Sequence, residues 1–368
     1  MKPIDLSKFR KDITKTIPGL SVGFRDPKVW ISTGNYALNY AISGRFRDGG
    51  IPLGKVTMLG GQSGSGKSFL ASGNITKNAQ DKDVFVVLID TENALDQSWL
   101  HALSVKTDEN SLLKVNMAMI DDVARLISDF MKDYKARYGS LDEDQRPRVL
   151  FVIDSLGMLL TPTDVNQFEA GDLKGDMGRK PKALAALVRN CVNMFGEYDI
   201  GMVCTNHSYA SQDMFNPDDV ISGGQGPVYA SSIVLAMRKL KLKEDEDGNK
   251  TSEVNGIRAQ CKIMKTRYNK PFESVEIKIP YDRGMDIYSG LLDLFEKKGL
   301  LTKEGNRLSY TKLDGGTIKM FRKAWEHNEH GALDTVMDEF HKKMDKVAPP
   351  LEADILEDLP EELLTDAD

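Results

Sequence analysis

The chain has 368 residues, of which 40% are hydrophobic, so it can fill one large domain and a smaller one. Its three cysteines are far apart and odd in number, a pattern that fits neither a disulfide framework nor a metal knuckle. We therefore expect the protein to be located in a reducing cytosol. There is no run of about 18 apolar residues, and the charged start lacks the apolar stretch of a secretory signal, so we expect neither a membrane span nor secretion.

The formal net charge of −6 is concentrated at the end of the chain. Residues 351–368 carry eight acidic side chains and no basic one; subtracting these eight from the 55 Asp and Glu leaves 47, against 49 Lys and Arg. The rest of the chain is therefore nearly neutral and compatible with a nucleic-acid partner. We expect residues 347–368 to be an acidic, disordered tail, which is solvated, competes with phosphates for a basic groove, or docks a partner.

Residues 1–30 are predicted to form an N-terminal oligomerisation arm. A short amphipathic stretch there has apolar side chains at Ile4, Leu6, Phe9 and Ile13. An isolated helix of this length is marginal in water, so we expect the arm to pack on its own core or on a neighbouring subunit. Phe9 and Phe24 are the candidate rings for docking on that neighbour.

Residues 31–285 alternate apolar strand segments with segments of helical periodicity. The predicted strands are 56–59, 84–89, 149–153, 200–205, 232–237 and 258–264, and the predicted helices are 69–80, 121–138 and 180–197. Segment 240–254 is predicted to be an exposed hairpin or loop. This alternation indicates an α/β core with a mostly parallel, twisted sheet and helices on both faces.

Residues 286–346 contain shorter helical and strand-like pieces, from which we predict a small α+β C-terminal domain. The segment Val347-Ala348-Pro349-Pro350 then acts as a linker into the tail.

A phosphate-binding loop is predicted between strand 56–59 and the helix that Phe69 opens, and we include Phe69 in the nucleotide site. The loop matches G-x-x-x-x-G-K-[ST] without a defect, and its residues are Gly61, Gln62, Ser63, Gly64, Ser65, Gly66, Lys67 and Ser68. Its glycines let backbone N–H groups surround phosphates, and the helix N-terminus adds a positive dipole end. We expect Lys67 to bridge the β- and γ-phosphates of ATP and Ser68 to hold Mg²⁺.

Two acidic residues at predicted strand ends supply the carboxylates that an ATPase site needs beside its phosphate loop. Asp154 follows the apolar run 149–153, where its carboxylate is placed to hold the Mg²⁺ shell through water. Glu92 lies just past strand 84–89 and could polarise the attacking water. Asp90 is a rival for that role because it lies at the same strand end.

Two long, glycine-containing segments, 166–179 and 208–229, interrupt the core pattern, and loops of this length inside a domain are usually functional or disordered. Neither is strongly basic.

Several ordered motifs resemble RecA-like strand-exchange recombinases. Residues 88–96, Leu-Ile-Asp-Thr-Glu-Asn-Ala-Leu-Asp, resemble the bacterial RecA stretch after the phosphate loop. Residues 151–157, Phe-Val-Ile-Asp-Ser-Leu-Gly, and 205–207, Thr-Asn-His, are more similar to the phage UvsX type. The resemblance extends with gaps from about residue 32 to about residue 301.

The resemblance implies roles for five residues. It makes Glu92 the catalytic base and His207 the γ-phosphate sensor. It makes Trp99 the ring that stacks on adenine, with a buried core tryptophan as the alternative. Lys265 and Arg267 resemble the basic pair that reaches the γ-phosphate of a neighbouring subunit, with two surface cations as the alternative.

The implied function is that of an ATP- and Mg²⁺-dependent DNA recombinase. Such a protein forms homo-oligomeric helical filaments on single-stranded DNA and pairs it with homologous duplex DNA. In the family two loops, which segments 166–179 and 208–229 resemble, face the filament axis and hold single-stranded DNA; flexible glycines and backbone N–H groups can follow its phosphate chain, and large apolar side chains could wedge between its bases. The resemblance thus implies the candidate DNA-binding residues Gly171, Lys174, Gly175, Arg179, Met214, Phe215, Gly223, Gly224 and Gln225. A loader or mediator and a single-strand-binding protein are the expected partners, and the expected location is the cytoplasm, that of a bacterial host if a phage encodes the chain. A RecA-fold hexameric DNA helicase and a non-catalytic recombination mediator are the alternatives.

Overall fold

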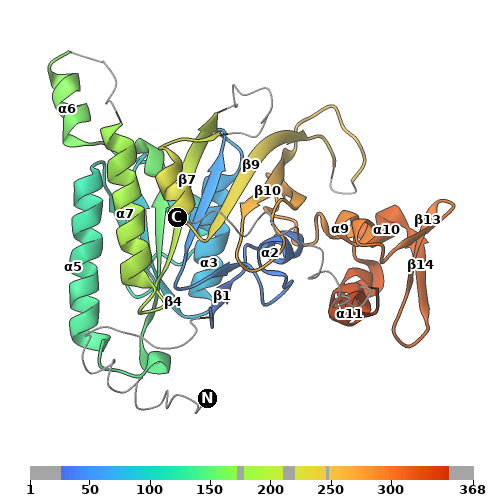
Figure 1. Ribbon diagram of the computed structural model, residues 1–368. Coiled ribbons are helices and arrows are strands. Elements are labelled where there is room, and N and C mark those ends of the chain that lie inside the picture. The colour runs from blue at the N-terminus through green and yellow to red at the C-terminus, as the bar shows by residue number, and fades with distance from the viewer. Residues whose placement is uncertain (1–25, 172–177, 210–219, 246–247, 348–368) are drawn as a thin grey trace, which may run out of the picture.

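The computed structural model describes residues 26–171, 178–209, 220–245 and 248–347 (Figure 1). The predictions for Lys174, Gly175, Met214, Phe215 and most of the arm and tail lie outside these residues.

A nine-stranded sheet forms the centre of the molecule, with the strand order β11-β10-β9-β3-β7-β6-β4-β5 and β8 paired to β7. The strands from β9 to β5 in this order run parallel, whereas β10, β11 and β8 are antiparallel to their neighbours. The strands are β3 (Val56–Gly61), β4 (Val84–Asp90), β5 (Leu112–Asn116), β6 (Arg148–Asp154), β7 (Gly201–Tyr209), β8 (Val220–Ile221), β9 (Ile233–Leu242), β10 (Gly256–Lys265) and β11 (Ser274–Pro280).

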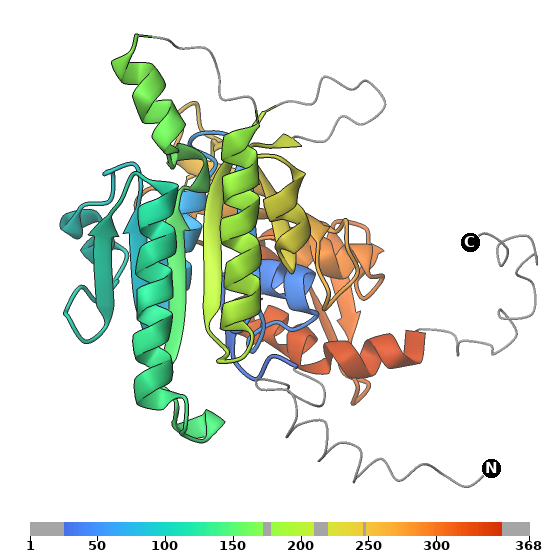
Figure 2. The same ribbon diagram turned by 60° about the vertical axis from the view of Figure 1, so that its left-hand side comes forward.

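Helices cover both faces of this sheet. Figure 2 shows α5 (Ile120–Tyr138) and α7 (Arg179–Phe195) side by side on one face. The other face carries α2 (Tyr36–Ser43) and the helix after β3, which is π-helical as η1 (Phe69–Ile75) and α-helical as α3 (Thr76–Gln80). The shorter elements are β1 (Trp30–Ile31), β2 (Ile51–Pro52), α4 (Gln97–Ala102), η2 (Glu143–Gln145), η3 (Leu156–Met158), α6 (Pro162–Glu169) and α8 (Gln225–Ala230).

The buried strands send alternate side chains into two separate cores. In β4, Val86 and Leu88 join the core under α2 and η1, while Val87 and Ile89 join the core under α5 and α7. Successive side chains of a strand point to opposite faces, so a strand covered on both faces must be apolar throughout. This is why the sequence of β4 is a continuous apolar run and not an alternating one.

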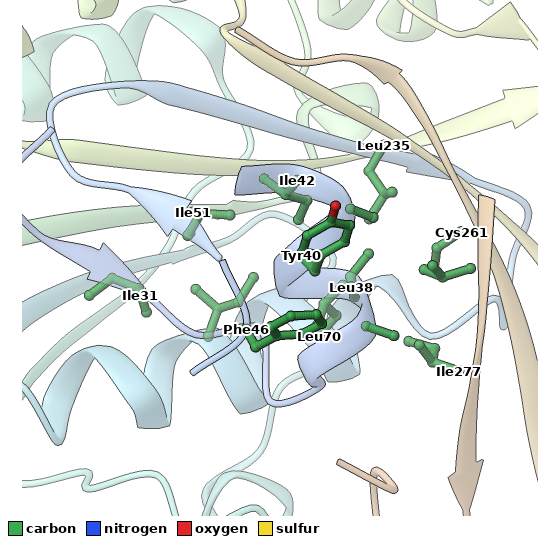
Figure 3. Close-up of a cluster of buried hydrophobic side chains, with 14 of the residues drawn as sticks. Ile31, Leu38, Tyr40, Ile42, Phe46, Ile51, Leu70, Leu235, Cys261 and Ile277 are labelled. Atoms are coloured by element: carbon green, nitrogen blue, oxygen red, sulfur yellow. The ribbon is translucent and has the colours of Figure 1, made fainter. Parts of the chain in front are cut away.

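The C-terminal segment is built from α9 (Leu291–Lys297), a three-stranded sheet of β12 (Thr302–Glu304), β13 (Arg307–Thr311) and β14 (Thr317–Phe321), then α10 (Arg322–Glu326), η4 (Glu329–Gly331) and α11 (Ala332–Val347). It lies beside α2 (Figure 1), and its Phe295 and Phe340 contact Phe46 edge to face. Figure 3 shows Tyr40 and Phe46 within this cluster of buried side chains, where their rings stack at 4.8 Å.

The predicted α/β fold class is confirmed, and each predicted strand is present. Three details differ from the prediction: helix 69–80 begins as a π-helix, α6 occupies the first residues of the predicted loop 166–179, and β8 and α8 occupy the end of the predicted loop 208–229. β9 and β10 pair antiparallel, so the described residues on both sides of 246–247 in segment 240–254 lie at the end of this pair, where Glu244 and Lys250 form an isolated bridge. The division into an arm, a core, a C-terminal domain and a tail stays a prediction. No helix in the described part of the chain is both long and apolar enough to cross a bilayer.

Candidate nucleotide site

The candidate site lies where the carboxyl ends of four parallel strands meet. In the sheet register Gly61 of β3 lies opposite His207 of β7, and Asp90 of β4 lies opposite Asp154 of β6. In open α/β sheets ligands bind at this edge. The register therefore brings together a phosphate loop, two acids and a histidine that are distant in the sequence.

The phosphate loop follows β3 and leads directly into η1. Gly64 and Gly66 have φ values of 71° and 91°, a left-handed conformation that favours glycine. Lys67 Nζ donates to the carbonyl oxygens of Gly61 and Gln62 at 2.8 and 2.9 Å. Burial lowers the pKa of the Lys67 ammonium, and the charges of Asp154 and Glu92 counteract this. A bound polyphosphate would supply the counter-charge that this buried ammonium needs, so the loop fits ATP.

Asp154 is held in one orientation by two hydroxyl groups. The side chain is 5% exposed, and its oxygens accept hydrogen bonds from Ser72 Oγ at 2.8 Å and from Thr205 Oγ1. Each carboxylate oxygen keeps a further lone pair, so Asp154 can also accept from metal-bound water. Ser68 is the residue from which η1 begins, and its hydroxyl makes no capping hydrogen bond. These two residues fit the outer and inner shells of a Mg²⁺ ion, respectively.

Asp90 and Glu92, the two candidates for the base, have carboxylates in different environments. The Asp90 carboxylate is 1% exposed and accepts from the backbone N–H groups of Glu92, Ala94 and Leu95 at 3.0 to 3.4 Å. It also pairs with Lys114 Nζ at 3.1 Å. Asp90 therefore shapes the turn after β4, whereas Glu92 keeps a partly exposed carboxylate at the site.

Glu92 and His207 are brought together at this edge. Glu92 Oε1 lies 3.6 Å from His207 Nε2 and accepts a 2.9 Å hydrogen bond from Ser155 Oγ. His207 belongs to the end of β7, beside the first residue of the phosphate loop. A carboxylate and an imidazole at this point can orient water and contact a terminal phosphate.

Trp99 and Phe69 both pack against the core under α2. Trp99 lies in α4, which Asp96 caps through the Trp99 N–H at 2.7 Å. Its ring is half-buried and packs against the core under α2, as does that of Phe69. Phe69 also faces Gly284, where an added Cβ would lie 3.6 Å from its Cζ. The adenine-stacking role of Trp99 and the nucleotide role of Phe69 stay predictions.

Lys265 is not at the phosphate loop of its own chain, and Arg267 follows two residues after it, beyond the end of β10. Lys265 ends β10 and lies opposite Val234, which in turn lies opposite Met58, three residues before Gly61. Three residues of strand span about 10 Å. Lys265 Nζ donates to the carbonyl oxygen of Tyr229 at 2.7 Å, and burial together with the charge of Arg267 lowers its pKa.

The described glycines of the two predicted DNA loops have different surroundings. Gly171 has a φ of 68° and open space where a Cβ would be. Gly223 and Gly224 instead approach α7, and an added Cβ would lie 3.1 Å from Leu184 and 3.2 Å from Pro181, respectively. Gln225 begins α8, and Arg179 begins α7 with its Nη1 3.4 Å from Thr163 Oγ1. Gly223 and Gly224 thus lie close to α7, and the DNA-binding role of these loop residues stays a prediction.

Sequence reasoning missed the polar residues that orient the site, among them Thr91, Ser155, Thr205 and Ser72. Their signal was weak, since each is a small hydroxyl residue beside a motif residue or inside a helix. It also missed Lys239 of β9, whose Nζ would be 2.9 Å from a Cβ added to Gly64. This lysine approaches the phosphate loop only because β9 pairs with β3.

Fold and site together define an α/β nucleotide-binding protein of the P-loop class. The model of the RecA N-terminal domain matches residues 25–286, and the chain belongs to the RecA family. It is 28% identical over 282 residues to protein RecA of Geobacter sulfurreducens, covering 76% of this chain and 75% of that protein. RecA of Chlorobium chlorochromatii is 27% identical, with coverage of 76% and 72%, and RecA of Chloroherpeton thalassium is 28% identical, with coverage of 80% and 77%. The family acts in DNA recombination and repair and uses ATP with Mg²⁺.

Proposed function

We propose that this chain is a DNA-dependent ATPase that forms filaments on single-stranded DNA and catalyses homologous pairing and strand exchange. The observation that carries the proposal is the contact between Glu92 and His207 beside Gly61. In the proposal these two side chains act as the base and as the phosphate sensor at one phosphate loop. The strand that carries His207 leads directly into the segment predicted to bind DNA.

In the proposed reaction the residues of one subunit bind the nucleotide and orient water. Mg²⁺, when bound with ATP, neutralises charge on the phosphates. Lys67 would exchange the carbonyls of Gly61 and Gln62 for the phosphates, and Ser68 and Asp154 are the residues that would hold the metal and its water. Glu92 accepts the proton of the attacking water, and His207 hydrogen-bonds the terminal phosphate and thereby reports its presence to the chain that follows β7.

We further propose that Lys265 and Arg267 act on the nucleotide of a neighbouring subunit. The position of Lys265 in the sheet register supports this, since it lies away from the phosphate loop of its own chain. A guanidinium and an ammonium stabilise the charge that develops on a transferred phosphoryl group. Hydrolysis would then require two neighbouring subunits to assemble, which is the arrangement of subunits in a filament.

The finer parts of the proposal rest on the sequence. The loops 166–179 and 208–229 would hold single-stranded DNA, and the partners would include a loader or mediator and a single-strand-binding protein. The motifs at 151–157 and 205–207 support a protein of the phage UvsX type that acts in the cytosol of a bacterial host. The C-terminal segment 286–346 would form its own small domain.

A joint-molecule assay tests the proposal. Purified protein is incubated with ATP, Mg²⁺, a labelled single strand and a homologous supercoiled duplex, with Lys67→Ala and a heterologous duplex as controls. We expect pairing that requires ATP and homology and that fails in the variant. DNA-stimulated hydrolysis without pairing, together with ring-shaped particles and duplex unwinding, would point to a helicase. Equal background hydrolysis by the wild type and Glu92→Gln would point to a mediator.

A further inference from the structure

We propose that Ser155 is a positioning residue for the Glu92 carboxylate and that Thr91 holds the backbone of Ser155 in a fixed position. This inference rests on the proposed function, because it assumes that Glu92 acts as the base. It concerns two hydroxyl groups that belong to neighbouring strand ends and that touch neither the phosphate loop nor the sensor histidine in the described contacts.

Thr91 and Ser155 form a reciprocal pair. Thr91 Oγ1 accepts a hydrogen bond from Ser155 N–H and donates one to the Ser155 carbonyl oxygen, both at 2.8 Å. The Thr91 N–H donates to the carbonyl of Asp154 at 2.9 Å. The two side chains are 8% and 1% exposed. A single buried hydroxyl therefore satisfies both backbone groups of Ser155.

This pair continues the joining of β4 and β6 beyond the last residues of the ladder. The backbone register ends at Asp90 opposite Asp154, the final residues of the two strands. One residue further on, the Thr91 hydroxyl makes the hydrogen bonds to the backbone N–H and carbonyl of Ser155 that a neighbouring strand's backbone would otherwise make. The position of Ser155 relative to the turn after β4 is thereby defined, although neither residue lies in a strand.

With its backbone held, Ser155 has one hydroxyl left, and that hydroxyl donates to Glu92 Oε1 at 2.9 Å. The Glu92 side chain is 37% exposed, so water alone would leave its rotamers free. Asp90 already holds the Glu92 backbone N–H at 3.1 Å. Asp90 thus orients the backbone of Glu92, and Ser155 orients its carboxylate toward His207.

Such a device affects the rate of hydrolysis more than the binding of nucleotide. A hydrogen bond to a charged carboxylate that holds it in the productive orientation corresponds to about 10-fold to 100-fold in rate. None of the three residues Thr91, Ser155 and Glu92 belongs to the phosphate loop. Loss of the Ser155 hydroxyl should therefore lower kcat and leave the affinity for ADP nearly unchanged.

The test uses the full chain and measures single-stranded-DNA-stimulated ATPase, ADP affinity and melting temperature. We expect Ser155→Ala and Thr91→Val to lower kcat about 10-fold or more, with ADP affinity changed less than about threefold. Thr91→Ser keeps the hydroxyl and should restore most of the rate. Thr76→Val is the matched control, because it removes a buried threonine hydroxyl that donates to the Ala71 carbonyl at 3.0 Å, outside this cluster.

A double-variant comparison separates positioning from simple destabilisation. If Ser155 acts through Glu92, then Ser155→Ala has no further effect on the residual rate of Glu92→Gln, whereas an independent structural defect would multiply with it. Two results would overturn the inference and leave the proposed function intact. One is a double variant whose loss of rate is the product of the two single losses, and the other is a normal rate in Ser155→Ala beside an inactive Glu92→Gln. An unimpaired Glu92→Gln would instead refute the assignment of the base.

Discussion

Lys114 Nζ lies 3.1 Å from Asp90 Oδ2 and supplies the cation for a carboxylate that is only 1% exposed. The two residues lie on the neighbouring strands β5 and β4, and Lys114 itself is 27% exposed. The pair supports the turn that carries Thr91 and Glu92, because the same carboxylate receives the N–H groups of that turn. The edge strand β5 thereby supports the candidate nucleotide site through the turn after β4.

Replacing Lys114 by Met should therefore weaken both stability and hydrolysis. The variant leaves the Asp90 charge buried with only backbone donors, which costs about 1–3 kcal/mol of unfolding free energy. Urea unfolding and ATPase turnover measure the two effects. Lys132→Met is the control, because Lys132 pairs with Asp129 on the exposed surface of α5 and should change stability by less than about 0.5 kcal/mol. Equal stability of the two variants would contradict the proposed contribution of the Lys114–Asp90 ion pair.

Gly64→Ala should impair nucleotide binding beyond its effect on stability. An alanine at position 64 would have to adopt a φ of 71°, a conformation that costs about 1 kcal/mol or more outside glycine, within the loop whose backbone N–H groups would surround the phosphates. Its Cβ would also lie 2.9 Å from Lys239 Nζ, which ends a flexible side chain and can move away. Gly305→Ala is the matched control, since Gly305 has a φ of 60° with open space around it. We expect similar losses of melting temperature but weaker ADP binding only in Gly64→Ala. ADP binding as tight in Gly64→Ala as in Gly305→Ala would contradict the role of this loop in nucleotide binding.

The three thiols should be unreactive in the native protein. Burial raises the pKa of Cys191 and of Cys261 to about 12 and raises that of Cys204 well above its ordinary value. The native state therefore keeps thiol protons that the unfolded chain loses above about pH 9, so this contribution to stability falls as pH rises toward 12. At pH 8 a chromogenic disulfide reagent should react slowly before urea is added and rapidly after it. A thiol that reacts at the unfolded rate in the native protein would disprove this burial.

Removing residues 351–368 should speed loading onto DNA. The eight acidic side chains of this segment form a polyanion, and its loss should also change the salt dependence of loading. A full-length chain with those residues replaced by Asn and Gln should behave like the truncation, because the proposed effect depends on charge. Loading that is unchanged at several salt concentrations would rule out this role of the tail.

Much of the site could be predicted because its signals are local. The phosphate loop, Asp154, Glu92 and His207 each follow an apolar strand segment, and parallel strands bring their carboxyl ends to one edge. The rivalry between Asp90 and Glu92 could not be resolved this way. Both follow the same strand, and only the backbone donors and Lys114 around Asp90 distinguish them.

The sequence by itself determined the α/β class, the phosphate loop and the order of the strands along the chain, because these depend on periodicity and on residues that are adjacent in the chain. The tertiary structure alone decided the spatial order of the strands, the packing of Gly223 and Gly224 against α7, and the pairing of Thr91 with Ser155. Those contacts join segments distant in the sequence. A short hydroxyl or a glycine acquires such a partner only when the register of the sheet places another chain segment within about 3 Å of it.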